Sequence, residues 1–119
     1  MTQHLTLTTD APVALKPLIE SAIRSELRML EIGLERTRQH LQAFEEQYGL
    51  TSAEFARRFE TGELEESLEF IEWVGEIKTG RLLEAHQEAL RGVHLIGHGI
   101  CSSGPPLIVT SAFLFQYLH

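Results

Sequence analysis

The sequence contains few of the features that specify a secreted scaffold or a membrane span. Cys101 is its single cysteine, so no disulfide can form within the chain, and we expect a reducing, cytoplasmic location. The apolar stretches at 93–101 and 107–115 are separated by a Ser/Gly/Pro segment, and each is far shorter than the roughly 20 residues that cross a bilayer. We therefore expect no membrane association.

Basic side chains are also scarce: 10 of them face 17 acidic ones, giving a net charge of −7 over 119 residues. A net negative charge repels phosphate backbones, which makes nucleic-acid binding an unfavourable hypothesis. The length allows one domain of ordinary size.

Motifs for catalysis or cofactor binding are missing. The sequence has no G-x-S-x-G elbow and no glycine-rich nucleotide loop, so we expect neither an enzyme nor a cofactor. His94, His98 and Cys101 form the one array with donors that suit zinc. They are weak metal candidates, because no fourth ligand is evident and Gly97 and Gly99 oppose a helix there.

Charge divides the chain into two parts. All charged side chains lie in residues 1–91, whereas residues 92–119 carry none and include four of the nine glycines. We expect a domain at 1–91 and a tail at 92–119 that is disordered or non-ancestral. An alternative for the tail is a strand at 107–110 that joins Leu5 and Leu7, because this segment is rich in β-favouring residues.

A short strand and a long helix are predicted before residue 49. Residues 4–8 alternate polar and apolar side chains, and such a strand needs a neighbour, from a second copy or a partner. Residues 17–48 repeat apolar side chains at steps of three and four, which is typical of a coiled-coil seam. We expect homodimerisation through Leu27, Leu30, Leu34, Leu41, Phe44 and Tyr48.

Two further helices complete a predicted helical hairpin. Gly49 is expected to end the long helix, and Thr51 with Glu54 forms a capping-box pattern before a short helix at 52–60. A third helix is predicted from about 64 to 91. Gly75 and Gly80 are unfavourable inside it, so we expect close packing against both. The predicted fold is mainly α, with an N-terminal strand.

The stretch from Glu60 to Glu76 contains seven glutamates and neither lysine nor arginine. Aromatic residues are interleaved with it, an arrangement that can place apolar anchors inside a charged rim. An ordinary solvated helix face is the alternative, and Trp73 would then belong to the core. The predicted partner-binding residues are Phe55, Phe59, Glu63, Glu65, Glu66, Glu69 and Trp73.

The segments 48–55, 57–64 and 69–73 resemble a group of small helical prokaryotic proteins of poorly assigned function, found in toxin–antitoxin-like gene pairs. The resemblance covers about residues 5–93. Its motifs are a cap, an aromatic tip and a helix start, and they carry no catalytic residues. It implies an antitoxin-like protein that binds a small basic effector.

Three hypotheses follow for the function. The first is a non-catalytic module that neutralises a small basic protein through its acidic and aromatic face. The second is a structural coiled-coil module that only oligomerises. The third is a DNA-binding regulator that uses the N-terminal strand as a β-ribbon. Lys16 is the one basic residue near that strand, which argues against the third.

Overall fold

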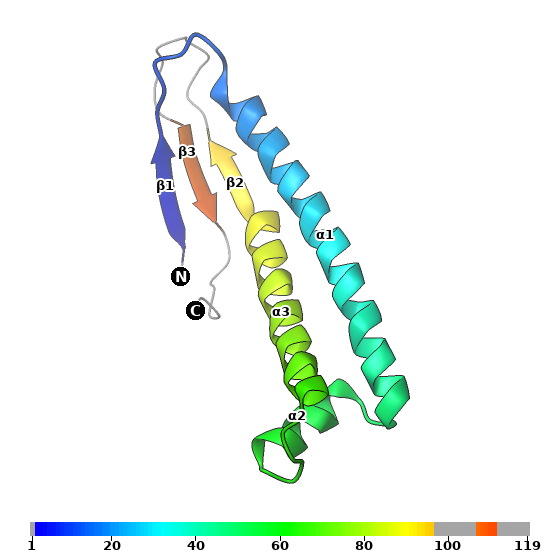
Figure 1. The fold of residues 1–119 in the computed structure, drawn as a ribbon. Coiled ribbons are helices and arrows are strands. Elements are labelled where there is room, and N and C mark those ends of the chain that lie inside the picture. The colour runs from blue at the N-terminus through cyan, green and yellow to red at the C-terminus, as the bar shows by residue number, and fades with distance from the viewer. Residues whose placement is uncertain (1, 97–106, 112–119) are drawn as a thin grey trace. The chain divides into compact units, whose positions relative to one another are not determined.

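The computed structural model describes residues 2–96 and 107–111 (Figure 1). Their element order is β1 (Gln3–Leu7), α1 (Leu15–Tyr48), α2 (Ser52–Glu60), α3 (Leu68–Arg91), β2 (Val93–Ile96) and β3 (Leu107–Ser111). The mainly helical class, the three helices and the short N-terminal strand are confirmed. His98 and Cys101 lie outside the described residues.

Helix α1 begins two residues earlier than predicted, at Leu15. Pro17 therefore lies inside the first turn, where its missing N–H would have no intrahelical acceptor. The helix has 34 residues, or about 51 Å at 1.5 Å per residue. It ends at Tyr48 as predicted, and Gly49 adopts a φ of 67°, which favours glycine because it lacks a Cβ.

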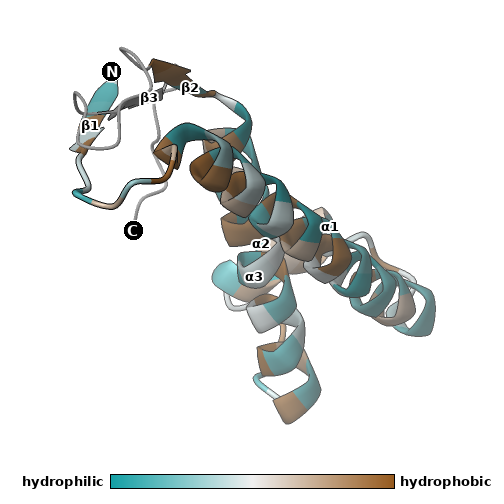
Figure 2. Cartoon of the chain, turned by 90° about the horizontal axis from the view of Figure 1, so that it is seen from above, coloured by the Kyte–Doolittle hydropathy of each residue, from teal (hydrophilic) through white to brown (hydrophobic). Residues whose placement is uncertain are grey.

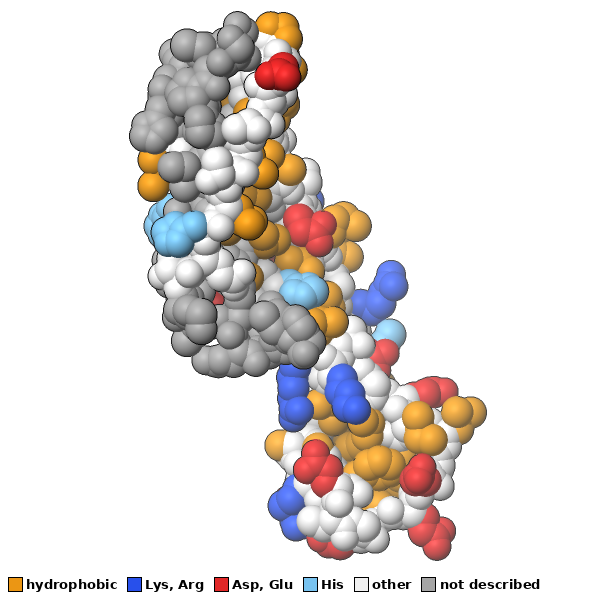
Figure 3. Space-filling view, turned by 90° about the vertical axis from the view of Figure 1, so that its left-hand side faces the viewer, with side chains coloured by type: hydrophobic (Ala, Val, Ile, Leu, Met, Phe, Trp, Pro, Cys, Tyr) orange, Lys and Arg blue, Asp and Glu red, His pale blue; other side chains and the backbone are white. Residues whose placement is uncertain are grey.

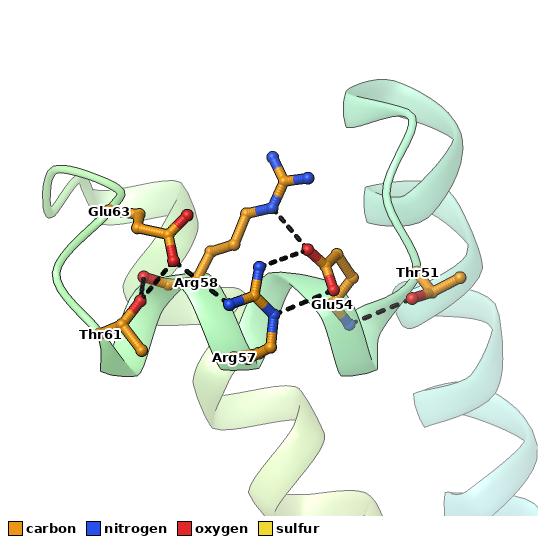
Figure 4. Close-up of polar contacts among 6 residues, drawn as sticks. All are labelled: Thr51, Glu54, Arg57, Arg58, Thr61 and Glu63. Carbon is orange, nitrogen blue, oxygen red and sulfur yellow. Dashed lines mark hydrogen bonds and ion pairs between the residues drawn. The ribbon is translucent and has the colours of Figure 1, made fainter.

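Helix α2 has the predicted bounds, but its cap is only half of a capping box. The Thr51 hydroxyl accepts a hydrogen bond from the Glu54 N–H at 3.1 Å. The Glu54 carboxylate accepts hydrogen bonds from Arg57 and Arg58 (Figure 4). A second free N–H of the first turn, that of Ser52, donates to a carboxylate oxygen of Glu45 in α1 at 2.7 Å.

Helix α3 begins at Leu68, four residues after the predicted start at Leu64. Ser67 accounts for the difference, because its hydroxyl accepts from the Phe70 N–H at 3.1 Å and its carbonyl accepts from the Ile71 N–H at 2.9 Å. Serine is a preferred N-cap for this reason. The apolar periodicity that continues back to Leu64 does not mark the helix boundary.

The chain divides into two compact units, which we call the hairpin unit (31–84) and the terminal unit (1–30 with 85–119). Both long helices contribute to each unit. Figure 2 shows hydrophobic and hydrophilic residues alternating around α1 and α3, as expected for helices with one buried face.

The hairpin unit is built around Trp73 of α3. Its ring stacks on Phe55 at a centroid distance of 3.9 Å and on Phe44 at 5.3 Å. Tyr48 stacks on the same ring at 5.7 Å. The indole N–H donates to the Ser52 hydroxyl at 2.9 Å, so the one polar atom of this buried side chain has a partner.

The predicted oligomer seam is largely used inside the chain. Leu30 and Leu34 are buried, and Thr37, which completes the series, is buried as well. Phe44 and Tyr48 pack on Trp73 of the same chain. Part of this stripe therefore packs within the chain, and homodimerisation through it stays a prediction.

The terminal unit contains a three-stranded antiparallel sheet of order β1-β3-β2. Leu5 of β1 lies opposite Val109 of β3, and Leu7 lies opposite Leu107. The strand alternative for residues 107–110 is thus confirmed, and β1 finds its neighbour within its own chain. Strand β2 was not predicted, since four residues after a helix carry little periodicity.

Candidate partner-binding groove

Two of the three predicted aromatic anchors lie in the core rather than on a surface. Phe55 and Trp73 are both 0% exposed, and Phe59 is half-buried. Phe59 contacts Phe55 with ring centroids 5.5 Å apart. Phe55 and Trp73 are therefore corrected from contact residues to core residues, the alternative that the sequence left open for Trp73.

The predicted glutamates, by contrast, are all exposed. Glu63 accepts hydrogen bonds from the Thr61 hydroxyl at 2.8 Å and from Arg57 at 3.3 Å. Glu69 accepts from the Gln47 amide at 3.1 Å. Glu65 and Glu66 lie in the loop that precedes α3. The predicted carboxylates at this end of the hairpin unit thus lie on its surface.

A groove of about 550 Å³ opens between α1 and α3 within the hairpin unit. This volume falls within the range of ordinary binding pockets. We call it the acidic groove; its lining residues are His40, Ala43, Phe44 and Gln47 of α1 with Glu72, Gly75, Glu76 and Thr79 of α3. Its acidic side chains come from α3, and no lysine or arginine lines it.

Two polar bridges between α1 and α3 mark the ends of the groove. His40 Nδ1 lies 2.9 Å from the Glu76 carboxylate, and the Gln47 amide donates to Glu69. The partners are seven residues apart on each helix, so both bridges lie on the same face. They fix the relative position of the two helices along the groove.

Glu69 of the second bridge also affects the pKa of Tyr48. A hydrogen bond with the Glu69 carboxylate raises the pKa of Tyr48 above 10.0, and burial and the charge of Glu69 add to this shift. This shift disfavours ionisation of the phenol, whose ring packs on the aromatic core.

The arginines of α2 do not neutralise the groove, because they pair with other carboxylates. Arg57 and Arg58 both bind Glu54, with N···O distances of 2.7 Å, and Arg57 also reaches Glu63 (Figure 4). These contacts lower the pKa of Glu54 to about 2, mainly through the Arg57 and Arg58 hydrogen bonds, while Glu54 raises the pKa of Arg57.

A second hollow, of about 280 Å³, lies between α2 and α3. Phe59, Val74 and Ile77 line it together with Lys78 and Arg81. Figure 3 shows one face of the protein, where hydrophobic side chains near the α2 end are surrounded by acidic and basic ones. Because two cations and only one carboxylate, that of Glu60, line this smaller hollow, it suits a basic partner less well than the acidic groove does.

Residues 2–96 and 107–111 contain no cluster of three or more potential metal ligands. His94 lies in β2, opposite Thr110 of β3. His94, the one described member of the weak zinc array, therefore belongs to no such cluster in this part of the chain.

The groove residues that the sequence did not single out are His40, Ala43, Gln47 and Thr79, and Gly75 was singled out only as a packed glycine. Their signal is weak, because a spacing of three or four on a helix marks any shared face. Which face of α1 meets which face of α3 depends on packing. The acidic contribution of α3 is the part that the sequence did indicate.

None of the helices in the described part of the chain is long and apolar enough to cross a membrane. Comparisons with protein families, curated proteins and solved structures found no match to this chain.

Proposed function

We propose that this protein is a non-catalytic, antitoxin-like binding module that holds a small basic protein against the acidic groove of its hairpin unit. The observation that carries this proposal is the groove itself: a depression of about 550 Å³ lined by apolar residues such as Ala43 and Phe44, by acidic side chains from α3 and by no lysine or arginine. The acidic stretch 60–76 extends this negative surface into the loop before α3.

The two kinds of surface have separate roles in binding. Opposite charge accelerates the encounter of the two proteins and aligns them. Contact with Ala43, Phe44 and Gly75 of the groove lining removes apolar surface from water, which slows dissociation. In this proposal Phe55 and Trp73 act indirectly, because their stacking holds α2 against α3.

The structure changes the choice of glutamates for a test. Glu69 accepts from Gln47 and affects Tyr48, so its reversal to lysine would disturb the fold as well as the surface. Glu65, Glu66 and Glu72 are exposed and carry no such structural bond. Their combined replacement by lysine changes the charge of the surface with the least effect on packing.

The experiment compares this triple variant with a matched control in which Glu26, Glu31 and Glu88 are changed to lysine. Both variants have the same net charge. Tagged full-length proteins are used to capture partners from the lysate of the native host at low and high salt, with identification by mass spectrometry. A small basic protein should be retained by the wild type and the control at low salt, and lost from the groove variant.

Equal capture by both triple variants would contradict the proposal, since net charge and not the groove would then decide binding. Recovery of the bait alone would favour the structural oligomerisation module instead. One observation supports that second candidate: Leu18 and Met29 of α1 are exposed, at 55% and 61%. Replacing both by glutamate should then reduce the oligomer mass in light scattering.

A further inference from the structure

Three glycines of the hairpin unit lie inside α1 and α3, and their surroundings differ. A Cβ atom on Gly80 would lie 3.2 Å from the Thr37 methyl group, and one on Gly33 would lie 3.3 Å from Leu83. At Gly75 a Cβ would meet nothing within 4 Å. Close packing is therefore confirmed at Gly80, whereas the same expectation for Gly75 was wrong.

Gly75 thus lowers helix stability without a packing benefit inside the chain. Glycine in a helix interior costs about 0.5–1 kcal/mol relative to alanine. Gly75 lines the acidic groove, and its neighbours there, Ala43 and Thr79, are also small. Small side chains on facing helices leave space for a third backbone to approach closely.

Exposed apolar side chains extend this surface along α3. Leu68 and Leu82 lie seven residues before and after Gly75, and seven residues are close to two helical turns, so the three share a face. Leu68 is 73% exposed and Leu82 47%, and the neighbouring Ile71 is 52% exposed. From Leu68 to Leu82 this face extends about 21 Å.

We infer that the acidic groove receives an amphipathic, basic α-helix of the partner, whose backbone crosses α3 at Gly75 while its apolar side chains contact Leu68, Ile71 and Leu82. This inference rests on the proposed function and specifies the element that binds. A helix of about 15 residues matches the length of this face. Its lysine or arginine side chains would lie beside Glu72 and Glu76.

Charge decides between such a helix and a second copy of this chain. None of α1, α2 and α3 contains more basic than acidic residues. A helix from another copy would therefore bring at least as many carboxylates as cations to Glu72 and Glu76, so charge does not favour it. A helix with basic flanks pairs with the carboxylates that rim the groove.

The test uses two synthetic helical peptides with the same leucine stripe, one with lysine flanks and one with glutamate flanks. Binding of each labelled peptide to the full-length protein is measured by fluorescence anisotropy. The lysine peptide should bind the wild type, and Gly75→Leu should weaken this binding by about tenfold or more, because the new side chain fills the crossing point. The glutamate peptide should not bind.

Arg81→Leu is the matched control, since it adds a leucine to an exposed α3 position outside the acidic groove. It should bind the lysine peptide at least as tightly as the wild type does, because it also removes a positive charge. Melting temperatures identify any variant that fails to fold.

Equal binding of the lysine peptide to Gly75→Leu and to the wild type, or no binding to either, would overturn the inference. The proposed function and this inference can fail independently of each other. If the Glu65, Glu66 and Glu72 triple variant loses the host partner while Gly75→Leu keeps it, the acidic face binds the partner and the helix does not cross at Gly75.

Discussion

The contacts inside the hairpin unit and those inside the terminal unit differ in how far apart the joined residues lie along the sequence. In the hairpin unit the rings that surround Trp73 come from residues 44–70, so the core closes over short stretches of chain. In the terminal unit β1 pairs with β3, about 100 residues away along the sequence. Ring contacts across up to about 30 residues and strand pairing across about 100 residues therefore coexist in one small chain.

This comparison indicates where the stability of the chain lies. The two large side chains with no exposure among the described residues, Phe55 and Trp73, both belong to the hairpin unit. Strand β1 is mostly exposed, with only Leu7 half-buried. We expect the hairpin unit to keep its structure when the sheet is disturbed, and the following predictions test this difference.

The largest effect is expected for Trp73→Ala. Removal of the buried indole leaves a cavity beside Phe44 and Phe55, and such truncations lower the free energy of unfolding by about 3–5 kcal/mol. Urea denaturation followed by circular dichroism measures the change. Leu68→Ala serves as the control, because this exposed side chain should alter stability by less than about 0.5 kcal/mol. Similar losses for both would contradict the central role of the aromatic cluster.

The next effect is local and follows truncation after Gly92, which removes β2 and β3. Without β3, β1 loses its ladder, and a lone strand is not stable in water. Hydrogen exchange of residues 3–7 should reach the rate of an unstructured chain, while residues 52–60 and 68–84 keep their protection. If protection is lost throughout 52–84, the hairpin unit depends on the sheet.

Smaller changes in the free energy of unfolding are expected at two glycines of α3, and the two changes should have opposite signs. Gly75→Ala should raise the free energy of unfolding by about 0.5–1 kcal/mol, because the added methyl group meets open space. Gly80→Ala should lower it, because Thr37 is buried, β-branched and only 3.2 Å from the new methyl group. Thermal unfolding of the two variants measures both signs, and a shared sign would contradict the geometry.

The smallest effect concerns the ion pairs of α2. The pKa of Glu54 is about 2 in the folded chain, below its unfolded value of about 4.5. Its ion pairs therefore stabilise the fold above pH 4.5, and this contribution is lost as the pH falls from 4.5 towards 2. The melting temperature of Glu54→Gln should be lower than that of the wild type at pH 7, and the two should converge on acidification. A constant difference would assign the effect to something other than this carboxylate.

Much of the local structure could be predicted because it depends on neighbouring residues. Thr51 accepts a bond from an N–H three residues later, and Gly49 ends α1 by adopting a left-handed conformation. Ser67 offered the same kind of signal for the start of α3. It was outweighed by the apolar period that begins at Leu64, so that boundary was placed four residues too early.

The candidate site was harder to predict, because it joins residues about 30 positions apart. The acidic contribution of Glu72 and Glu76 was visible in the sequence, but their meeting with His40 and Ala43 depends on how α1 and α3 are rotated against each other. Phe55 and Trp73 were predicted as contact residues, although they are buried, for the same reason. The sequence predicts that Trp73 packs against apolar side chains. It does not show whether those side chains belong to the same chain or to a partner.

The sequence by itself determined the helices, their ends at Gly49 and Thr61, the apolar stripe of α1 and the acidic stretch before and within α3, since each depends on local backbone preferences or on composition. The tertiary structure determined which residues pack on that stripe. It also determined that Gly80 is closely packed while Gly75 is open, and that β1 pairs with β3. These outcomes depend on contacts between distant segments. Burial of Phe55 and Trp73 removes them from the surface, and what remains exposed beside Gly75 is an acidic groove.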